Sequence, residues 1–486
     1  MRVMKLILIV LLLTSCGGND MKYNVQKIFG DTTAAWIWPT RPVAIRHVGI
    51  HDKTYFGWVD NTGKVYVASY DHDENVYDIT QIHDWGVGDD HNHPALYIRK
   101  DGRIIAFAGG HNESNIPYYI STNPEDISSF GAQKTISKKS GATGYSYPQP
   151  VYLSNEDRIY LFFRRDALES EVNNAVRAWG FAISEDNGET FIEHDTLLFV
   201  ENDVYSPYTV PVSNGRDTIY FARSDWKASG QSYVREDVRF VKYKAGNFYR
   251  ADDSIVGSIY DLPISKNDMD IIYNSSAENR YAYISDIAID DQERPVLVFT
   301  TLEKGTDETG DYDGSGMNYH HFAFWTGSEW VETQIVEAGG DILAPERNSH
   351  PAYNAGIMLN HSDPFEVVLG REKVFNSKKF YIELWRFNGS TFQKTEDITE
   401  NIPGLPDKVF RPVIPRNYHE NFKILFLGGD YTWYRSWETY LYRVYISNLK
   451  GKVTDAYVNI DGQKFVEQAY VKVNGTWEPV NEGFVY

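Results

Sequence analysis

The sequence predicts an all-β protein, a seven-bladed β-propeller with a short C-terminal β appendage. A two-strand pattern, made of a short apolar run, a turn and a second β-rich run, recurs seven times along the 486 residues. The copies begin about 46 to 76 residues apart and turn on Gly, Asn or Asp, as propeller blades do. No stretch shows a sustained helical period. The copies begin at Arg46, His93, Tyr147, Ser206, Ala282, His350 and Phe410.

Further hairpins fill the intervals between these inner pairs. The segments PYYISTNPEDISSF, WGFAISEDNGETF and HHFAFWTGSEW alternate apolar and polar residues and turn on Gly, Asn or Asp, as the outer strands of a blade do. We therefore assign residues 41–450 to the propeller. Because its inner strands converge on one central channel, we expect residues from different blades to meet at the mouth of that channel.

The first residues have the pattern of an export signal. A basic start and a short apolar core lead to the tetrapeptide LTSC, which ends at Cys16. This ending resembles the bacterial lipobox, whose cysteine is lipidated; a non-lipidated signal peptide is the alternative. The apolar core is shorter than the roughly 20 residues of a membrane span. We predict a lipoprotein signal peptide over residues 1–15, a lipidated Cys16, a linker over residues 16–40 and a location at the outer membrane or cell surface.

The C-terminal residues 451–486 differ from the blades. They contain two short strands whose AYV…G…V patterns echo each other. We predict a small β module here. Packing against the propeller and a free appendage are both open.

Composition excludes some functions. The net charge of −20 argues against nucleic-acid binding, which needs a basic face. It does not exclude an acidic substrate, because a local arginine cluster dominates the field inside a cleft. The single cysteine leaves no disulfide framework and no thiolate metal site. Aromatic residues make up 15% of the chain, which suits both strands and stacking against sugar rings.

The segment from Ser184 to Phe191 fits the Asp-box pattern S-x-D-x-G-x-T-F/W. In this pattern the Asp side chain caps its own turn, the Gly adopts a positive φ and the aromatic residue is buried beneath. The motif is specific for propeller hairpins and sits on the outside of a blade. Its role is therefore structural.

The segment DDHNHP, which holds His91 and His93, is the sharpest functional signal together with His111. His91 and His93 precede an inner strand with the same side-chain parity, and His111 follows the paired strand, so all three belong to one rim. Two imidazoles at a channel mouth suit proton transfer near neutral pH. The alternatives are histidines that only hydrogen-bond the loops, or a metal site, although the spacing lacks H-x-x-x-H and a nearby thiolate.

The next two blades place Tyr and Arg at the same rim. Tyr147 opens one inner strand and Arg164 closes its partner; Tyr205 and Tyr208 precede Arg223 in the following blade. An arginine fork matches a carboxylate, and a tyrosine beside it can exchange a proton. Each residue alone is ordinary, but the coincidence over three consecutive blades indicates a site.

The segments DDHNHPALYIRKDGRIIAFAGGH and YPQPVYLSNEDRIYLFFRR, with the Asp box, resemble the BNR-repeat seven-bladed propeller polysaccharide lyases, in particular the ulvan lyases. The resemblance covers about residues 40–450 in architecture and 89–225 in motifs. Such enzymes cleave a uronic-acid-containing sulfated polysaccharide by β-elimination, with a histidine and a tyrosine as base and acid and an arginine that neutralises the uronate. It therefore implies a lyase that releases unsaturated uronate oligosaccharides.

The resemblance also implies residue roles. Matched motif by motif, the catalytic residues are His91, Tyr147 and Arg164, and the substrate-binding residues are His111 and Tyr208. We add His93 and Arg223 as substrate-binding candidates from their rim positions. Which of His91 and Tyr147 is the base stays open, and so does the register that selects His91 over His93.

Some relatives carry a cysteine-containing zinc site, but this chain has no cysteine after Cys16. We expect no metal and no organic cofactor, an anionic uronate polysaccharide as substrate, and a monomer. Two rivals remain. A sialidase-like glycoside hydrolase needs paired carboxylates or an arginine triad, and a non-catalytic glycan-binding propeller needs only the aromatic rim. The fold does not decide between them.

Overall fold

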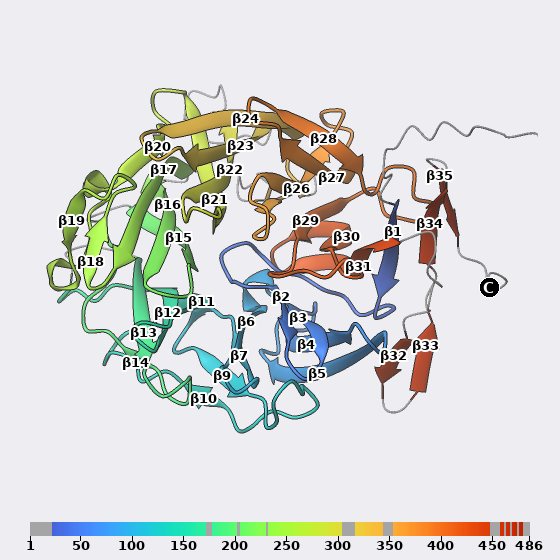
Figure 1. Ribbon diagram of the computed structural model, residues 1–486, viewed down its shortest axis with the longest axis horizontal. Helices are drawn as coiled ribbons and strands as arrows, with labels where there is room; N and C mark the ends of the chain where they lie inside the picture. The colour runs from blue at the N-terminus through green and yellow to red at the C-terminus, as the bar shows by residue number, and fades with distance from the viewer. Residues whose placement is uncertain are drawn as a thin grey trace, which may run out of the picture.

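Seven β-sheets stand around a central channel in the computed structural model (Figure 1), which confirms the predicted all-β propeller. The structure describes residues 22–171, 177–201, 205–229, 232–303, 316–343 and 353–447, and four short strands between residues 457 and 479. The signal peptide and Cys16 lie outside the described residues. Within the described part, no helix is long and apolar enough to cross a membrane.

Each blade is an antiparallel sheet whose inner pair is one of the predicted repeats. The first blade contains β2 (Ala44–Val48), β3 (Asp52–Val59), β4 (Lys64–Asp71) and β5 (Val76–Asp84). The second contains β6 (Pro94–Ile98), β7 (Ile104–Ala108), β9 (Pro117–Ile120) and β10 (Lys134–Thr135). The third contains β8 (His111–Glu113), β11 (Tyr145–Leu153), β12 (Arg158–Arg165), β13 (Ala178–Ser184) and β14 (Ile192–Glu193).

The next three blades continue the pattern. The fourth contains β15 (Tyr205–Ser213), β16 (Thr218–Ser229), β17 (Ser232–Lys244), β18 (Asn247–Tyr249), β19 (Ile255–Ser258) and β20 (Asp270–Tyr273). The fifth contains β21 (Arg280–Ile289), β22 (Pro295–Glu303), β23 (Asn318–Trp325) and β24 (Trp330–Gly339). The sixth contains β25 (Ile357–Leu359), β26 (Glu366–Glu372), β27 (Phe380–Phe387) and β28 (Phe392–Asp397). Short 3₁₀ turns are η1 (Asp90–Asn92), η2 (Ile259–Asp261) and η3 (Lys266–Asp268).

The seventh blade joins the two ends of the propeller. Its strands β29 (Val409–Val413), β30 (Ile424–Trp433) and β31 (Ser436–Ser447) are completed by β1 (Lys22–Ile28), which pairs along its whole length with β31. The sequence predicts a linker over residues 16–40, but residues 22–28 of this segment form a blade strand. Tyr23, Val25 and Ile28 of β1 are buried and belong to the largest hydrophobic cluster among the described residues.

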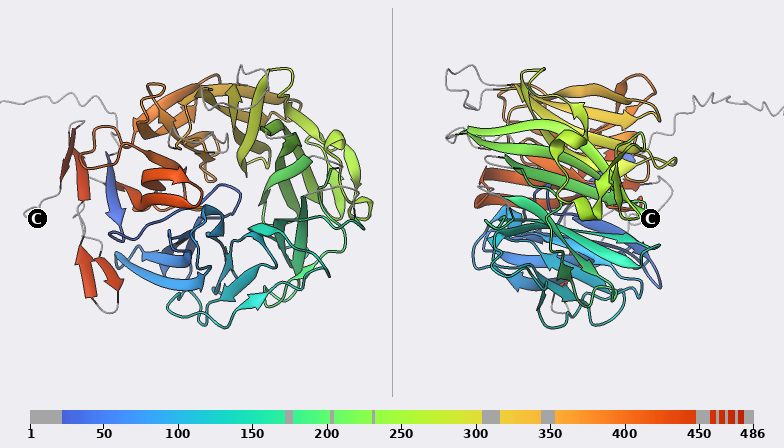
Figure 2. Two further views of the ribbon diagram at one scale, coloured as in Figure 1. Left: turned by 180° about the vertical axis from the view of Figure 1, so that it is seen from behind. Right: turned by 90° about the vertical axis from the view of Figure 1, so that its left-hand side faces the viewer.

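Four C-terminal strands lie outside the ring, beside β5 and β1 (Figures 1 and 2). They are β32 (Tyr457–Ile460), β33 (Gln463–Val466), β34 (Ala469–Val473) and β35 (Thr476–Pro479). β32 pairs in parallel with β5, and β34 pairs antiparallel with the free edge of β1. The module thus covers exposed edges of the first and seventh blades, which would otherwise be open to pairing with another chain.

Apolar side chains pack between neighbouring blades. In one cluster Ile105 and Phe107 of the second blade contact Leu161 and Phe163 of the third, together with Phe191 of the Asp box. The Asp box has the predicted construction: Asp186 accepts hydrogen bonds from the hydroxyl and the backbone N–H of Thr190, and Gly188 adopts a φ of +86°. Only 1% of Phe191 is exposed.

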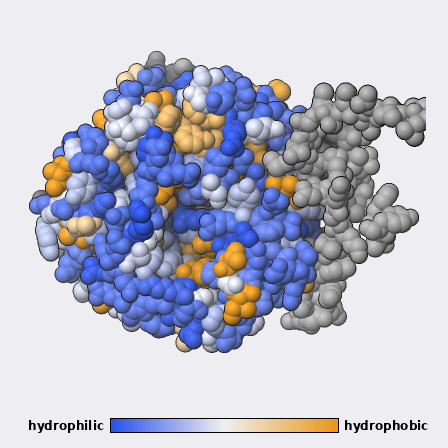
Figure 3. Space-filling view, viewed as in Figure 1, coloured by the Kyte–Doolittle hydropathy of each residue, from blue (hydrophilic) through white to orange (hydrophobic). Residues whose placement is uncertain are grey.

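The segment between β1 and β2, residues 29–43, crosses the middle of the ring (Figure 1), and we call it the plug. Ala35 exchanges backbone hydrogen bonds with Val59 of the first blade, and the Trp36 indole donates to the Arg411 carbonyl of the seventh. Arg41, which is only 6% exposed, donates to the Asp286 carboxylate of the fifth blade. The plug therefore connects the first, fifth and seventh blades through hydrogen bonds. Figure 3 shows that this face of the ring is largely hydrophilic and hollowed near its centre.

Replacing Arg41 with Met should lower the free energy of unfolding by about 3–5 kcal/mol, because the buried Asp286 then loses its arginine partner. Urea unfolding of the purified protein measures this change. The control is Arg216→Met, since Arg216 pairs with Glu293 with 62% of its side chain exposed; its cost should stay below about 1 kcal/mol. An equal loss of unfolding free energy in the two variants would show that the Arg41–Asp286 pair does not stabilise the fold.

Candidate active site

A cavity of about 400 Å³ opens at the channel mouth, between the plug and the rims of several blades. Its floor comes from the plug, and its walls carry aromatic and cationic side chains. It is lined by Ile37, Trp38, Pro39, His91, His111, Asn112, Tyr147, Arg164, Arg177, Tyr208, Trp226, Tyr353, Arg411, Trp433, Tyr434 and Arg435. The predicted residues His91, His111, Tyr147, Arg164 and Tyr208 thus meet in one place.

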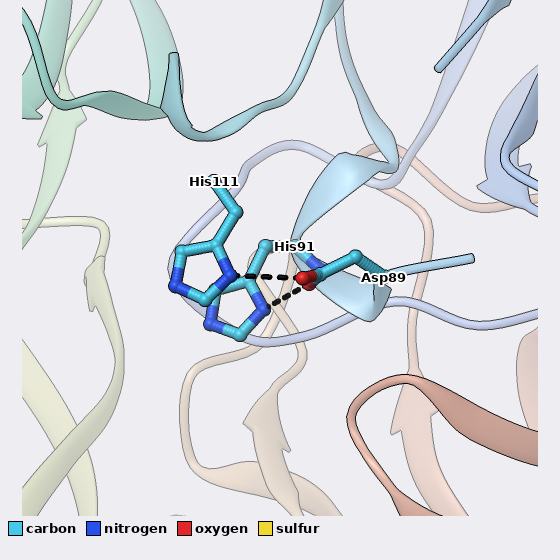
Figure 4. A group of neighbouring side chains, drawn as sticks. All are labelled: Asp89, His91 and His111. Carbon is cyan, nitrogen blue, oxygen red and sulfur yellow. Dashed lines mark hydrogen bonds and ion pairs between the residues drawn. The ribbon is translucent and has the colours of Figure 1, made fainter. Parts of the chain in front are cut away.

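Asp89 organises the histidine side of the cavity (Figure 4). It is the N-cap of η1 and accepts a hydrogen bond from the backbone N–H of His91. Its two carboxylate oxygens also lie 2.6 Å from Nδ1 of His91 and 2.9 Å from Nδ1 of His111. The two imidazole rings stack in parallel with centroids 3.7 Å apart. One carboxylate therefore orients both rings.

The two histidines have opposite protonation tendencies. Burial lowers the pKa of His91, but the charges of Asp89 and Asp90 outweigh it and raise the pKa to about 9. Burial and the adjacent His91 cation lower the pKa of His111 to about 4. At neutral pH, His91 is therefore an imidazolium and His111 a neutral imidazole.

The hydrogen bonds decide which nitrogen of each ring carries a proton. A carboxylate only accepts, so Nδ1 of each histidine must be the donor to Asp89. The second nitrogen of both rings, Nε2, points away from Asp89 (Figure 4). Nε2 of the charged His91 then carries a proton that it can give, whereas Nε2 of the neutral His111 has a lone pair that can accept a hydrogen bond.

The tyrosine–arginine side lies on the third and fourth blades. Arg164 donates to the phenol oxygens of Tyr147 and Tyr208, at 3.2 and 2.8 Å, and its guanidinium lies 4.4 Å from the centroid of the Tyr147 ring. Burial lowers the pKa of Arg164, but the two tyrosines outweigh it, so the pKa is raised. Among the described residues, none of the carboxylates lies within ion-pair distance of Arg164.

The backbone at Tyr147 explains how its side chain reaches the cavity. Its φ is +62°, in the left-handed region that non-glycine residues rarely adopt, and the pairing of β11 with β12 shifts register between Ser146 and Gln149. Such strain is held in place by surrounding structure and concentrates at functional sites. The Tyr147 ring lies 5.6 Å from the ring of His91, so the two sides of the cavity meet there.

Two predicted substrate contacts are not in the cavity. His93 is fully buried and its Nε2 lies 2.9 Å from the Ile37 carbonyl of the plug. The parity argument failed because residues 90–92 form the turn η1 rather than extended strand, so His91 and His93 point in different directions. Burial lowers the pKa of His93 to about 3, which keeps it neutral.

Arg223 does not line the cavity either. It is fully buried and pairs with Asp225 and Glu201 at 2.6 and 2.7 Å. These carboxylates already neutralise its charge, and the aspartate two residues later in FARSD was the available signal. The fourth blade instead contributes Tyr208 and Trp226 to the cavity lining. Of Tyr205, only the backbone is described.

Several cavity residues were not predicted from the sequence. Asn112 directly follows His111, Arg177 directly precedes β13, and Arg435 lies in the turn between β30 and β31. Trp38 comes from the plug, which the sequence did not place in the channel. Their positions at strand ends were visible, but nothing in the sequence separated them from other rim residues.

Asp89, His91 and His111 also have ligand atoms within 4.8 Å of one another, the spacing of a metal site. However, the Nδ1 atoms of both histidines already donate hydrogen bonds to the Asp89 carboxylate. A metal on these atoms would have to replace those protons. With these hydrogen bonds in place, Asp89 keeps a proton on Nδ1 of each histidine.

Comparison with known proteins identifies the family of the chain and several relatives. The model of the BNR repeat-containing family matches residues 53–338, more than half of the chain. "Ulvan Lyase-PL25" of Pseudoalteromonas sp. (strain PLSV) is 24% identical over 349 residues, which are 63% of this chain and 65% of that protein. The match thus spans slightly less than two thirds of that relative's length.

Two further matches extend over most of the chain. "Ulvan lyase" of Alteromonas sp. (strain LOR) is 23% identical over 465 residues, covering 86% of this chain and 89% of that protein. A solved structure of a polysaccharide lyase PL25 ulvan lyase bound to -[GlcA(1-4)Rha3S]- superposes with a TM-score of 0.60 at 17% identity, covering 88% of this chain and 98% of that one. At this identity the structural match establishes the shared fold.

The raised pKa of His91 predicts a loss of stability at alkaline pH. A group whose pKa is higher in the folded state stabilises the fold fully below about pH 6.5, and this contribution disappears as pH rises through about 9. The difference corresponds to about 3 kcal/mol. Urea unfolding at pH 6.5 and 9.5 should show this decrease, whereas His91→Gln should remove most of it. His93 and His111 titrate below this window. If His91→Gln loses as much stability between pH 6.5 and 9.5 as the wild type, the raised pKa does not belong to His91.

Proposed function

The chain belongs to the BNR repeat-containing family, and from this premise we propose that it is a polysaccharide lyase that cleaves ulvan by β-elimination. The observation that carries the proposal is the buried, charged Arg164, without a carboxylate partner among the described residues, between two tyrosines and opposite a histidine pair. An unneutralised guanidinium in a cavity suits an anionic group of the substrate. The ulvan lyases among the relatives support ulvan as the polymer.

The chemistry explains why an arginine is needed. β-Elimination removes the proton at C5 of a uronate, next to the carboxylate. While the carboxylate keeps its full charge, a second negative charge beside it is strongly unfavourable. Pairing with Arg164 lets that charge spread onto the carboxylate oxygens, and so stabilises the enolate-like transition state.

The proton positions assign the other two roles. His91 already carries protons on both nitrogens, so it cannot accept another and acts as the acid. Tyr147 takes the proton from C5 as its phenolate, which the Arg164 guanidinium, 3.2 Å from the phenol oxygen, stabilises. The C5–H electrons form the C4=C5 double bond, the C4–O bond breaks, and the leaving oxygen receives the proton from Nε2 of His91. His111 and Tyr208 hold sugar hydroxyls.

The hydrolase rival fits the cavity less well. A glycosidase needs two carboxyl groups that face the bond to be cleaved. Asp89 is occupied by His91, His111 and Arg435, and Asp90 by Arg411 and Tyr431. Neither carboxylate is among the residues that line the cavity. The remaining rival, a glycan-binding protein without activity, is separated by the assay below.

Incubation with ulvan should produce ultraviolet absorbance from the unsaturated uronate, which hydrolases and binding proteins do not generate. Arg164→Ala should reduce the rate by about a hundredfold or more, because transition-state charge stabilisation is lost. Arg164→Lys should be nearly as slow, since the planar fork is lost. A lysine variant with near-normal activity would show that Arg164 is not the neutralising residue.

His91→Gln and Tyr147→Phe should each lose most of the roughly 100- to 10,000-fold that positioned proton transfer supplies. Their combination should cost much less than the product of the two, because the pair acts as a unit. In the wild type, kcat/KM should fall as pH rises through about 9, where His91 loses its acidic proton. Asp89→Asn should move this alkaline limb to lower pH. A limb that stays in place would contradict His91 as the acid.

A further inference from the structure

Four arginines line the cavity, and they divide into two kinds. Arg411 lies 3.1 Å from the carboxylate of Asp90, and Arg435 lies 2.9 Å from that of Asp89. These two arginines therefore each have a carboxylate partner in the protein. Arg164 and Arg177 are the other kind.

Arg164 and Arg177 share a neutral partner. Both donate to Oδ1 of Asn112, Arg164 from 3.0 Å. The only ion pair of Arg177 among the described residues is with Asp166, at the 4.0 Å limit, and that carboxylate is 40% exposed. Two guanidinium groups thus meet on one amide oxygen, and the partly exposed carboxylate of Asp166 acts on both cations from a distance.

This arrangement has an electrostatic cost in the free protein. Burial lowers the pKa of Arg177, and the cation of Arg164 lowers it further. A single carboxylate can bridge both guanidinium groups, but each of them then receives only one oxygen. A ligand with two anionic groups, spaced by one sugar, satisfies both and removes the repulsion.

We propose that Arg177 binds the sulfate ester on the sugar next to the uronate, while Arg164 holds the uronate carboxylate. The inference rests on the proposed function and extends it to substrate choice. Arg177 has 23% of its side chain exposed and lines the cavity beside Arg164, so it is accessible to the adjacent sugar. Its planar fork matches two sulfate oxygens. Arg177 is then a specificity residue that favours sulfated over unsulfated polymer.

The test compares ulvan with the same polymer after chemical desulfation. Arg177→Gln should raise KM on ulvan roughly tenfold or more, with kcat changed less than about threefold, because a charge-assisted bond outside the reacting bonds is lost. On desulfated polymer, the wild type and Arg177→Gln should have similar KM values. Arg177→Lys should fall between them on ulvan, since charge remains but the fork is lost.

The matched control is Arg158→Gln. Arg158 lies at the opposite end of β12 from Arg164, pairs with Glu185 and is 39% exposed. It should behave as the wild type on both polymers. Thermal unfolding of each variant identifies any effect that comes from misfolding, and Arg177→Lys keeps the test informative if Arg177→Gln is unstable.

Two outcomes would overturn the proposal. Equal losses on sulfated and desulfated polymer would mean that Arg177 serves a uronate carboxylate, and no loss on either would remove it from the substrate site. Calorimetric binding of sulfated and desulfated oligosaccharides needs no turnover. It therefore tests Arg177 even if the wild type releases no unsaturated product, a result that would refute only the proposed function.

Discussion

The pairing of β1 with β31 is the constraint on which the rest of the molecule depends. It makes the first strand of the described chain the fourth strand of the last blade and so closes the ring. The chain that follows β1 passes through the middle of the ring before it reaches β2 (Figure 1), and Ile37, Trp38 and Pro39 of this segment line the cavity. The C-terminal strands then pair with β1 and β5 and cover the edges that closure leaves open.

Within this frame, the two sides of the cavity hold their charges differently. On the histidine side, Asp89 and Asp90 lie behind the lining residues and hold a proton on His91 that burial alone would remove. The other side concentrates cations: Arg164 and Arg177 face the cavity with an amide between them. The first side suits proton donation and the second suits an anionic polymer. The net charge of −20 conceals this local positive field, which is why the overall charge predicts little about the ligand.

Much of the fold could be predicted from the sequence because propeller blades are local structures. Each hairpin contains its own alternation and its own turn residues, as the Asp box with Asp186 and Gly188 illustrates. The same locality carried the prediction to His91, Tyr147 and Arg164, since the end of a strand is visible in the sequence. The errors arose where one residue departs from regular strand geometry. The prediction placed His93 in the cavity because it did not foresee the turn η1. It placed Arg223 there because it did not foresee the ion pair of Arg223 with Asp225.

The sequence by itself determined the blades, their number and the side chains available at one rim, because these follow from local periodicity and turn chemistry. Only the tertiary structure decided which of those side chains face each other. The contacts of Asp89 with Arg435, and of Arg164 with Tyr208, join residues of different blades. The plug lines the cavity through Ile37, Trp38 and Pro39, and nothing in its local pattern places it in the channel. Long-range pairing of this kind leaves no periodic mark in the sequence, since each partner appears there as an ordinary residue of a loop or a strand end.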